Sequence, residues 1–171
     1  DEFQGPLAID EQETRDGLYE NGVVFYLEGP LSEGFTPAQV NRCAHFAGGR
    51  LRARLPKLGK DYTVSLWFWN GLPDGARPVA GWLLSRGRDH SFDSPGDHLG
   101  LDGKGRLLFN DGTRTHLGKS TVKRWTWRQV ALTRKGENIR VYLDGKLEIE
   151  AQAKTEPLLE FLFVGGSLVF G

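Results

Sequence analysis

One predicted strand carries two acidic side chains whose spacing suits hydrolysis by an acid pair. In residues 146–151 apolar and charged residues alternate, so Leu147, Ile149 and Ala151 are expected on one strand face and Glu148 and Glu150 on the other. The two carboxylates would lie about 7 Å apart, within the loose range of acid pairs in glycoside hydrolases. An outer strand face in water shows the same alternation, and we favour this interpretation.

A short polar loop is a candidate calcium site. Residues 89–98 contain Asp89, Asp93 and Asp97 together with turn-forming Gly and Pro. Ca²⁺ prefers oxygen donors of this kind, so these three aspartates are the predicted metal ligands. A polar hairpin loop without metal has a similar composition, and no EF-hand spacing is present. Zinc bound by His90 and His98 of the same loop is less favoured than calcium, because the additional ligands cannot be named.

Three arginines alternate with apolar residues and are predicted to share one strand face. Arg50, Arg52 and Arg54 would then repeat at about 7 Å, a row on which a sulfated or uronic polysaccharide could lie. In the alternative interpretation, these arginines pair with neighbouring carboxylates. We favour this alternative because Lys plus Arg and Asp plus Glu both number 22, which gives zero net charge.

Tryptophans are the fourth group, because sugar rings stack on indoles. A tryptophan is more often buried than placed against a ligand, but three of the five lie at or near predicted strand ends and are freer to be exposed. The predicted ligand contacts are these three and two neighbouring asparagines: Trp69, Trp82, Trp125, Asn70 and Asn110.

A series of short β-strands must position these residues. Strands are predicted at residues 23–28, 43–47, 50–55, 62–69, 81–86, 98–102, 106–110, 113–117, 128–134, 139–143, 146–151 and 161–164. Turn pairs such as Asp111-Gly112 and Asp144-Gly145 connect them as hairpins, which predicts an all-β antiparallel sandwich. Residues 1–22 lack a sustained period and are interpreted as an irregular N-terminal arm, and residues 36–39 could form a helical turn.

Six segments in order resemble laminin G-like domains of the concanavalin A-like lectin and glucanase superfamily, in their bacterial form. They are YTVSLWF (62–68), LLSRG (83–87), LGLD (99–102), WRQVALT (127–133), VYLDGK (141–146) and FLFVGG (161–166). The resemblance implies a jelly-roll β-sandwich over residues 23–171. It also implies that Trp67 and Trp127 pack structurally, and that calcium can bind at loop ends.

The resemblance also bears on catalysis and on the end of the fold. The superfamily includes laminarinase-type hydrolases with a motif similar to Glu-x-Asp-x-x-Glu, but around Glu148 and Glu150 the intervening Asp and the third acid are absent. We therefore expect no enzyme. A further strand with an Asp-Glu pair usually closes a sheet in this family, whereas this chain stops at Gly171. Either that strand was trimmed, or an N-terminal segment such as residues 23–28 is left on an exposed edge that would invite a partner strand.

Composition limits the partners and the setting. Zero net charge weakens a nucleic-acid interpretation, and no apolar run is long enough to cross a bilayer. The lone Cys43 cannot form an internal disulfide, and the absence of Met suggests a processed chain or a piece of a longer one.

The leading hypothesis is a non-catalytic module for a carbohydrate or protein ligand within a larger exported bacterial protein, which would be secreted, periplasmic or at the cell surface. The alternatives are a structural or assembly domain that contacts other domains of the parent chain and, more weakly, a glycoside hydrolase that uses Glu148 and Glu150.

Overall fold

The chain folds as an antiparallel β-protein. A computed structural model describes residues 6–10, 12, 15–30, 41–55, 59–71, 79–87, 95–154 and 160–165. These residues form strands β1 to β14 and no helix, so none of them builds a helix that could cross a membrane. The helical turn predicted at residues 36–39 lies outside the described residues.

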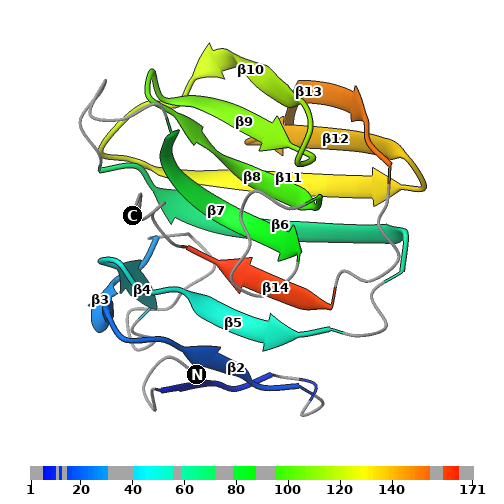
Figure 1. The fold of residues 1–171 in the computed structure, drawn as a ribbon. Coiled ribbons are helices and arrows are strands. Elements are labelled where there is room, and N and C mark those ends of the chain that lie inside the picture. The colour runs from blue at the N-terminus through cyan, green and yellow to red at the C-terminus, as the bar shows by residue number, and fades with distance from the viewer. Residues whose placement is uncertain are drawn as a thin grey trace.

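Two sheets make up most of the molecule. The larger one has the order β1 (Leu7–Ala8), β2 (Gly17–Tyr19), β5 (Leu51–Arg54), β14 (Phe161–Val164), β7 (Val79–Gly87), β8 (Asp97–Asp102), β9 (Arg106–Asn110), β10 (Thr115–Thr121). The smaller one has the order β13 (Lys146–Gln152), β12 (Asn138–Leu143), β11 (Trp127–Lys135), β6 (Asp61–Trp69). Figure 1 shows them as two layers, with the eight-stranded sheet toward the viewer. A separate hairpin joins β3 (Val23–Glu28) and β4 (Arg42–Phe46).

The strands and one of the turns agree with what the local sequence predicted. Each of the twelve predicted strands is present, three with the predicted bounds and nine with shifted ends. At the turn between β12 and β13, Asp144 has φ 47° and Gly145 has φ 77°. Positive φ at both central residues is what a two-residue type I′ hairpin turn requires, and Asp-Gly suits it. The fold class and this predicted hairpin are confirmed.

The N-terminal residues differ from the prediction of an irregular arm. Leu18 in β2 pairs with Leu7 in β1 and with Arg52 in β5, so both segments extend the eight-stranded sheet. Strands this short cannot display a period-two pattern, which is why the sequence did not predict them. Gly17 also permits a close approach, since a Cβ there would lie 2.6 Å from Leu51 Cδ1.

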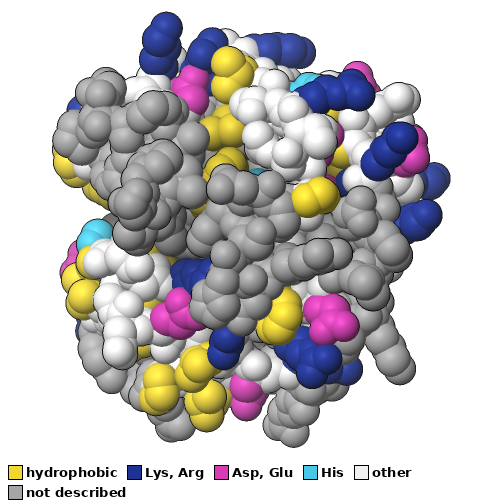
Figure 2. Space-filling view, in the orientation of Figure 1, with side chains coloured by type: hydrophobic (Ala, Val, Ile, Leu, Met, Phe, Trp, Pro, Cys, Tyr) yellow, Lys and Arg dark blue, Asp and Glu magenta, His cyan; other side chains and the backbone are white. Residues whose placement is uncertain are grey.

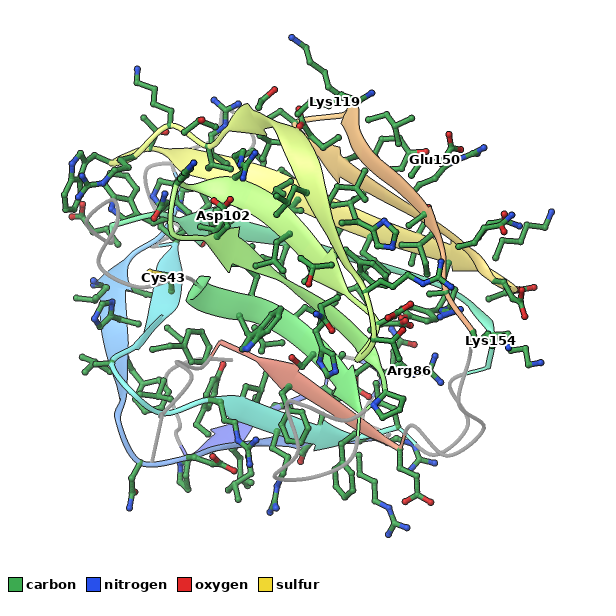
Figure 3. All side chains as sticks on the ribbon, turned by 45° about the horizontal axis from the view of Figure 1, so that its top comes forward. Cys43, Arg86, Asp102, Lys119, Glu150 and Lys154 are labelled. Carbon is green, nitrogen blue, oxygen red and sulfur yellow. The ribbon has the colours of Figure 1, made fainter. Side chains whose placement is uncertain are left out.

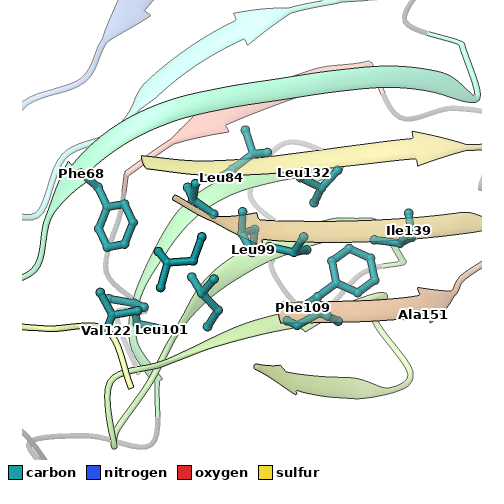
Figure 4. Close-up of a cluster of buried hydrophobic side chains, with 14 of the residues drawn as sticks. Phe68, Leu84, Leu99, Leu101, Phe109, Val122, Leu132, Ile139 and Ala151 are labelled. Atoms are coloured by element: carbon teal, nitrogen blue, oxygen red, sulfur yellow. The ribbon is translucent and has the colours of Figure 1, made fainter. Parts of the chain in front are cut away.

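The hydrophobic core lies between the two sheets. Alternation in residues 62–69 divides the side chains into two sets without showing which one is buried, and in β6 the inward set is Tyr62, Val64, Leu66 and Phe68. The eight-stranded sheet contributes Leu84, Leu99, Leu101, Leu107 and Phe109, and the four-stranded sheet adds Val130, Leu132, Ile139, Val141 and Ile149 (Figure 4).

A buried ion pair also connects the sheets. Arg134 of β11 donates from Nε to Asp97 Oδ2 at 2.8 Å and from Nη2 to Asp97 Oδ1 at 2.9 Å, and both side chains are almost fully buried. The Tyr62 hydroxyl donates to the same carboxylate. Burial, followed by the charge and the hydrogen bond of Asp97, raises the pKa of Tyr62 far above its ordinary value, so Tyr62 stays protonated as a donor.

Candidate functional site

The predicted calcium ligands do not meet in the described structure. Both carboxylate oxygens of Asp97 accept hydrogen bonds from Arg134, which makes this aspartate a structural link. Its assignment as a metal ligand is therefore wrong, because the sequence could not show that Asp97 begins β8 and faces the interior. Asp89 and Asp93 lie outside the described residues, and their role stays a prediction. Among described residues no group of three or more His, Cys, Asp or Glu side chains could hold a metal.

The predicted carboxylate pair is separated by a β-bulge. Val141 pairs with Ile149 and Tyr142 with Leu147, so Glu148 is the extra residue of β13. A bulge re-aims side chains, and here Leu147 becomes exposed while Glu148 is buried. Glu150 remains exposed and projects into solvent (Figure 3). The expected alternation is therefore wrong at Leu147 and Glu148, and the two acids do not share a face.

The surroundings of Glu148 and Glu150 do not suit acid–base catalysis. Glu148 accepts hydrogen bonds from Lys119 N at 2.7 Å, Ser120 N at 2.8 Å and Ser120 Oγ at 2.8 Å. Burial by itself would raise the pKa of Glu148, but the hydrogen bonds from Ser120 and Lys119 outweigh it and lower that pKa. A carboxylate held ionised in this way is a poor general acid. Glu150 pairs with Arg140 at 2.8 Å.

The arginine row lies on the outer face of the eight-stranded sheet and is largely matched by acids. Arg50 donates from Nε to Glu20 at 2.8 Å, and its guanidinium lies 4.2 Å from the centre of the Phe163 ring. Arg54 pairs with Glu160 at 3.0 Å, whereas Arg52 is partly buried between β2 and β14. Figure 2 views this side of the molecule and shows basic and acidic side chains interspersed. This is the pairing that the alternative interpretation predicted.

Trp82 and Asn110, two predicted ligand contacts, are part of the structure of the same sheet. Trp82 is only 6% exposed, so its expected exposure is wrong. Its ring lies over Gly100, where a Cβ would be 2.8 Å from Trp82 Cε3, and beside the His98 ring at 5.7 Å. Asn110 donates to Thr115 Oγ1 at 2.8 Å and accepts from Gly112 N at 2.6 Å, which holds the β9–β10 turn.

The four remaining tryptophans gather on the four-stranded sheet and just before β11. Trp67 is 53%, Trp69 47% and Trp125 59% exposed, and Trp127 is half-buried. Trp69 and Trp127 face each other across β6 and β11, with ring centres 5.8 Å apart at an angle of 65°. We call these four residues the tryptophan surface. The interpretation of Trp67 as a packing residue is wrong, because it lies on the outward face of β6.

Trp125 is held in place by its neighbours. Its backbone N–H donates to Asn70 O at 3.0 Å, and a Cβ at Gly71 would lie 3.1 Å from Trp125 Cζ3 and 3.7 Å from Trp69 Cδ1. The Arg124 guanidinium lies 4.9 Å from the Trp125 ring centre. The φ of Trp125 is 60°, which is an outlier for a bulky side chain, and backbone strain of this kind clusters at functional sites.

Two of the predicted ligand contacts, Trp69 and Trp125, therefore lie side by side in the structure. The neighbouring Asn70 supports Trp125. The Asn70 side chain is buried, and its backbone carbonyl positions Trp125. Sequence reasoning missed Trp67 and Trp127 as members of this surface. Alternation along β6 placed Trp67 on the same face as Trp69, which was the signal that could have identified it.

Comparisons with known proteins agree with this architecture. A family model described as the concanavalin A-like lectin/glucanases superfamily matches residues 47–169, whereas no curated protein matches the chain significantly. Domain 4 of AbnA, an extracellular GH43 arabinanase from Geobacillus stearothermophilus solved with arabinotriose, is similar with a TM-score of 0.60 and 13% identity over 88% of this chain and 73% of that chain.

A second similar structure is the Trypanosoma rangeli sialidase in complex with 2,3-difluorosialic acid. The TM-score is 0.66 and the identity 17% over 98% of this chain, but only 26% of the sialidase chain is covered. At such identities these likenesses show the fold alone. Because the family model matches well over half of its residues, the chain belongs to the concanavalin A-like lectin/glucanase superfamily.

Proposed function

We propose that this chain is a non-catalytic carbohydrate-binding module and that its ligand contacts the tryptophan surface. The carrying observation is that Trp67, Trp69 and Trp125 are each about half exposed on one side of the molecule. Tryptophans are highly buried on average, and exposed apolar patches mark interaction sites. The C–H-rich faces of sugar rings pack well against the flat faces of indoles.

The superfamily and the comparisons support a carbohydrate as the ligand. The superfamily includes lectins by name, and the similar domain of the arabinanase was solved with arabinotriose. Among the described residues, Glu148 and Glu150 are the acid pair that would have suggested a hydrolase, and the bulge at Glu148 points their side chains in different directions. Binding without catalysis is therefore the function that the geometry supports best. Export of the parent protein stays a prediction.

A structural or assembly role is the second candidate, and a specific observation favours it. The N-terminal strands and the β3–β4 hairpin expose several large apolar side chains: Leu7, Ile9, Leu18, Val24 and Leu27. Such side chains at sheet edges could contact another domain of a longer chain. Sedimentation of the chain with and without its flanking sequence would test this role.

The proposed function is tested by binding to a panel of neutral and acidic polysaccharides. We expect Trp69→Ala and Trp125→Ala to weaken binding about tenfold each, the scale of one lost stacking contact. Leu117→Ala is the matched control, because Leu117 is an exposed apolar residue on β10 of the other sheet. Wild-type affinity in both tryptophan variants would rule out the tryptophan surface as the site.

A further inference from the structure

We infer that the tryptophan surface is one end of a longer track along β6 and β11 that binds an extended, neutral polysaccharide chain. This inference rests on the proposed function and specifies its ligand class. The track consists of eight outward side chains of the two strands: Thr63, Ser65, Trp67, Trp69, Trp127, Gln129, Ala131 and Thr133. The paired outward residues Asp61 and Lys135 follow Thr63 and Thr133 and end the track with one charge of each sign.

The first observation is the absence of charge from these eight outward positions. The charged residues Asp61 and Lys135 lie only at the far end of the two strands, so the stretch between them and the indoles is uncharged. The positions that are not tryptophan are mostly hydroxyl or amide side chains. Hydroxyl and amide groups match the donors and acceptors of neutral sugars.

The second observation is the length of the track. From Thr63 to Trp69 the strand advances by six residues, which corresponds to about 20 Å. This is longer than one sugar ring, so a monosaccharide would use only part of it. The indoles lie at one end, and Thr63 and Thr133 are paired at the other. An extended chain running parallel to the strands would use both ends.

The third observation concerns hydrogen bonding in the middle of the track. Gln129 Nε2 donates to Ser65 Oγ at 3.0 Å across the two strands, and this contact orients both side chains. A glutamine amide has a second hydrogen and a carbonyl oxygen, and a serine hydroxyl can donate as well as accept. The middle of the track therefore presents oriented polar groups next to the indole of Trp67.

Two arginines beside the track are paired with acids within the protein, and Arg124 lies over the Trp125 ring. Arg140 pairs with Glu150 at 2.8 Å, and Arg128 pairs with Asp144 beside the hairpin turn. An anionic chain would gain little from such matched pairs, while its own charges would lose hydration. A neutral chain incurs no such cost. The ligand class that fits is therefore a neutral polysaccharide rather than a uronic or sulfated one.

The inference is tested by calorimetric titration with neutral β-glucan and arabinan oligosaccharides, from disaccharide to octasaccharide, with alginate as the anionic probe. We expect affinity to rise with chain length and alginate to bind more weakly than the long neutral chains. Gln129→Ala and Ser65→Ala should each weaken binding of the octasaccharide about fivefold, the effect of one net hydrogen bond. They should weaken disaccharide binding less, because a disaccharide on the indoles reaches a smaller part of the track. Gln152→Ala, on the outer face of β13, is the matched control.

The outcomes separate this inference from the proposed function. Binding that depends on Trp69 but not on chain length, or that is tighter for alginate, would overturn the inference and leave the proposed function standing. Binding that is unaffected by Trp69→Ala would refute both. Failure of every neutral chain to bind would overturn the inference, as would association of the chain with itself or with a protein strand through the edge of β6.

Discussion

The outer faces of the two sheets use the same residue types in opposite ways. On the eight-stranded sheet, Arg50 and Arg54 are paired with acids and Trp82 is buried over Gly100. On the four-stranded sheet, Trp67 and Trp69 are about half exposed, and the outward positions of residues 63–69 and 127–133 carry no charge. Surroundings, more than residue type, therefore decide which tryptophans are available to a ligand.

The largest expected effect is on the free energy of unfolding and concerns the buried Arg134–Asp97 pair between the two sheets. Arg134→Ala leaves the Asp97 carboxylate buried without its cation, and breaking a buried pair in this way costs about 3–5 kcal/mol. We expect this loss in the free energy of unfolding measured with urea. Arg140→Ala is the control, because the Arg140–Glu150 pair is exposed on the outer face and should contribute little. Similar losses in both variants would contradict the account.

The second prediction compares one tryptophan from each face. Trp82→Ala should lower the free energy of unfolding by about 3–5 kcal/mol, because it removes a large buried side chain from the sheet surface. Trp67→Ala, at an exposed position, should change it by only about 0.5 kcal/mol. Chemical denaturation of both variants measures the difference. Equal costs would mean that the two faces are packed alike, and the contrast between them would fail.

The smallest expected effect concerns the edge where β13 meets β10. The folded-state pKa of Glu148 is lowered from 4.5, so its ionised form stabilises the fold. That contribution is fully present above pH 4.5 and is lost as the pH falls through the lower folded-state pKa. Glu148→Gln should therefore show a shallower loss of stability on acidification than the wild type, measured by denaturation across this range. A parallel pH dependence in both proteins would show that Glu148 is not involved.

Strand patterns and turn chemistry predicted most of the fold. Alternation along β6 separated Tyr62 and Phe68 from Trp67 and Trp69 without showing which set is buried, and Asp144-Gly145 predicted a hairpin. These features are local, so a sequence displays them directly.

The candidate site was only partly predictable, because burial and bulges depend on distant partners. Nothing near Trp82 in the sequence shows that its ring lies over Gly100 of another strand. The bulge at Glu148 is stabilised by backbone groups of Lys119 and Ser120, about thirty residues away in the chain. Trp69 and Trp125 were predicted correctly as exposed candidates. Only the folded structure shows that both rings lie next to Gly71.

The most direct test is a nuclear magnetic resonance titration of the five indole N–H signals with a neutral oligosaccharide that the chain binds. We expect the signals of Trp67, Trp69 and Trp125 to shift and saturate together, while the signal of the buried Trp82 stays in place. A shift of Trp82 with the other three unchanged would place the ligand on the eight-stranded sheet and contradict the central claim.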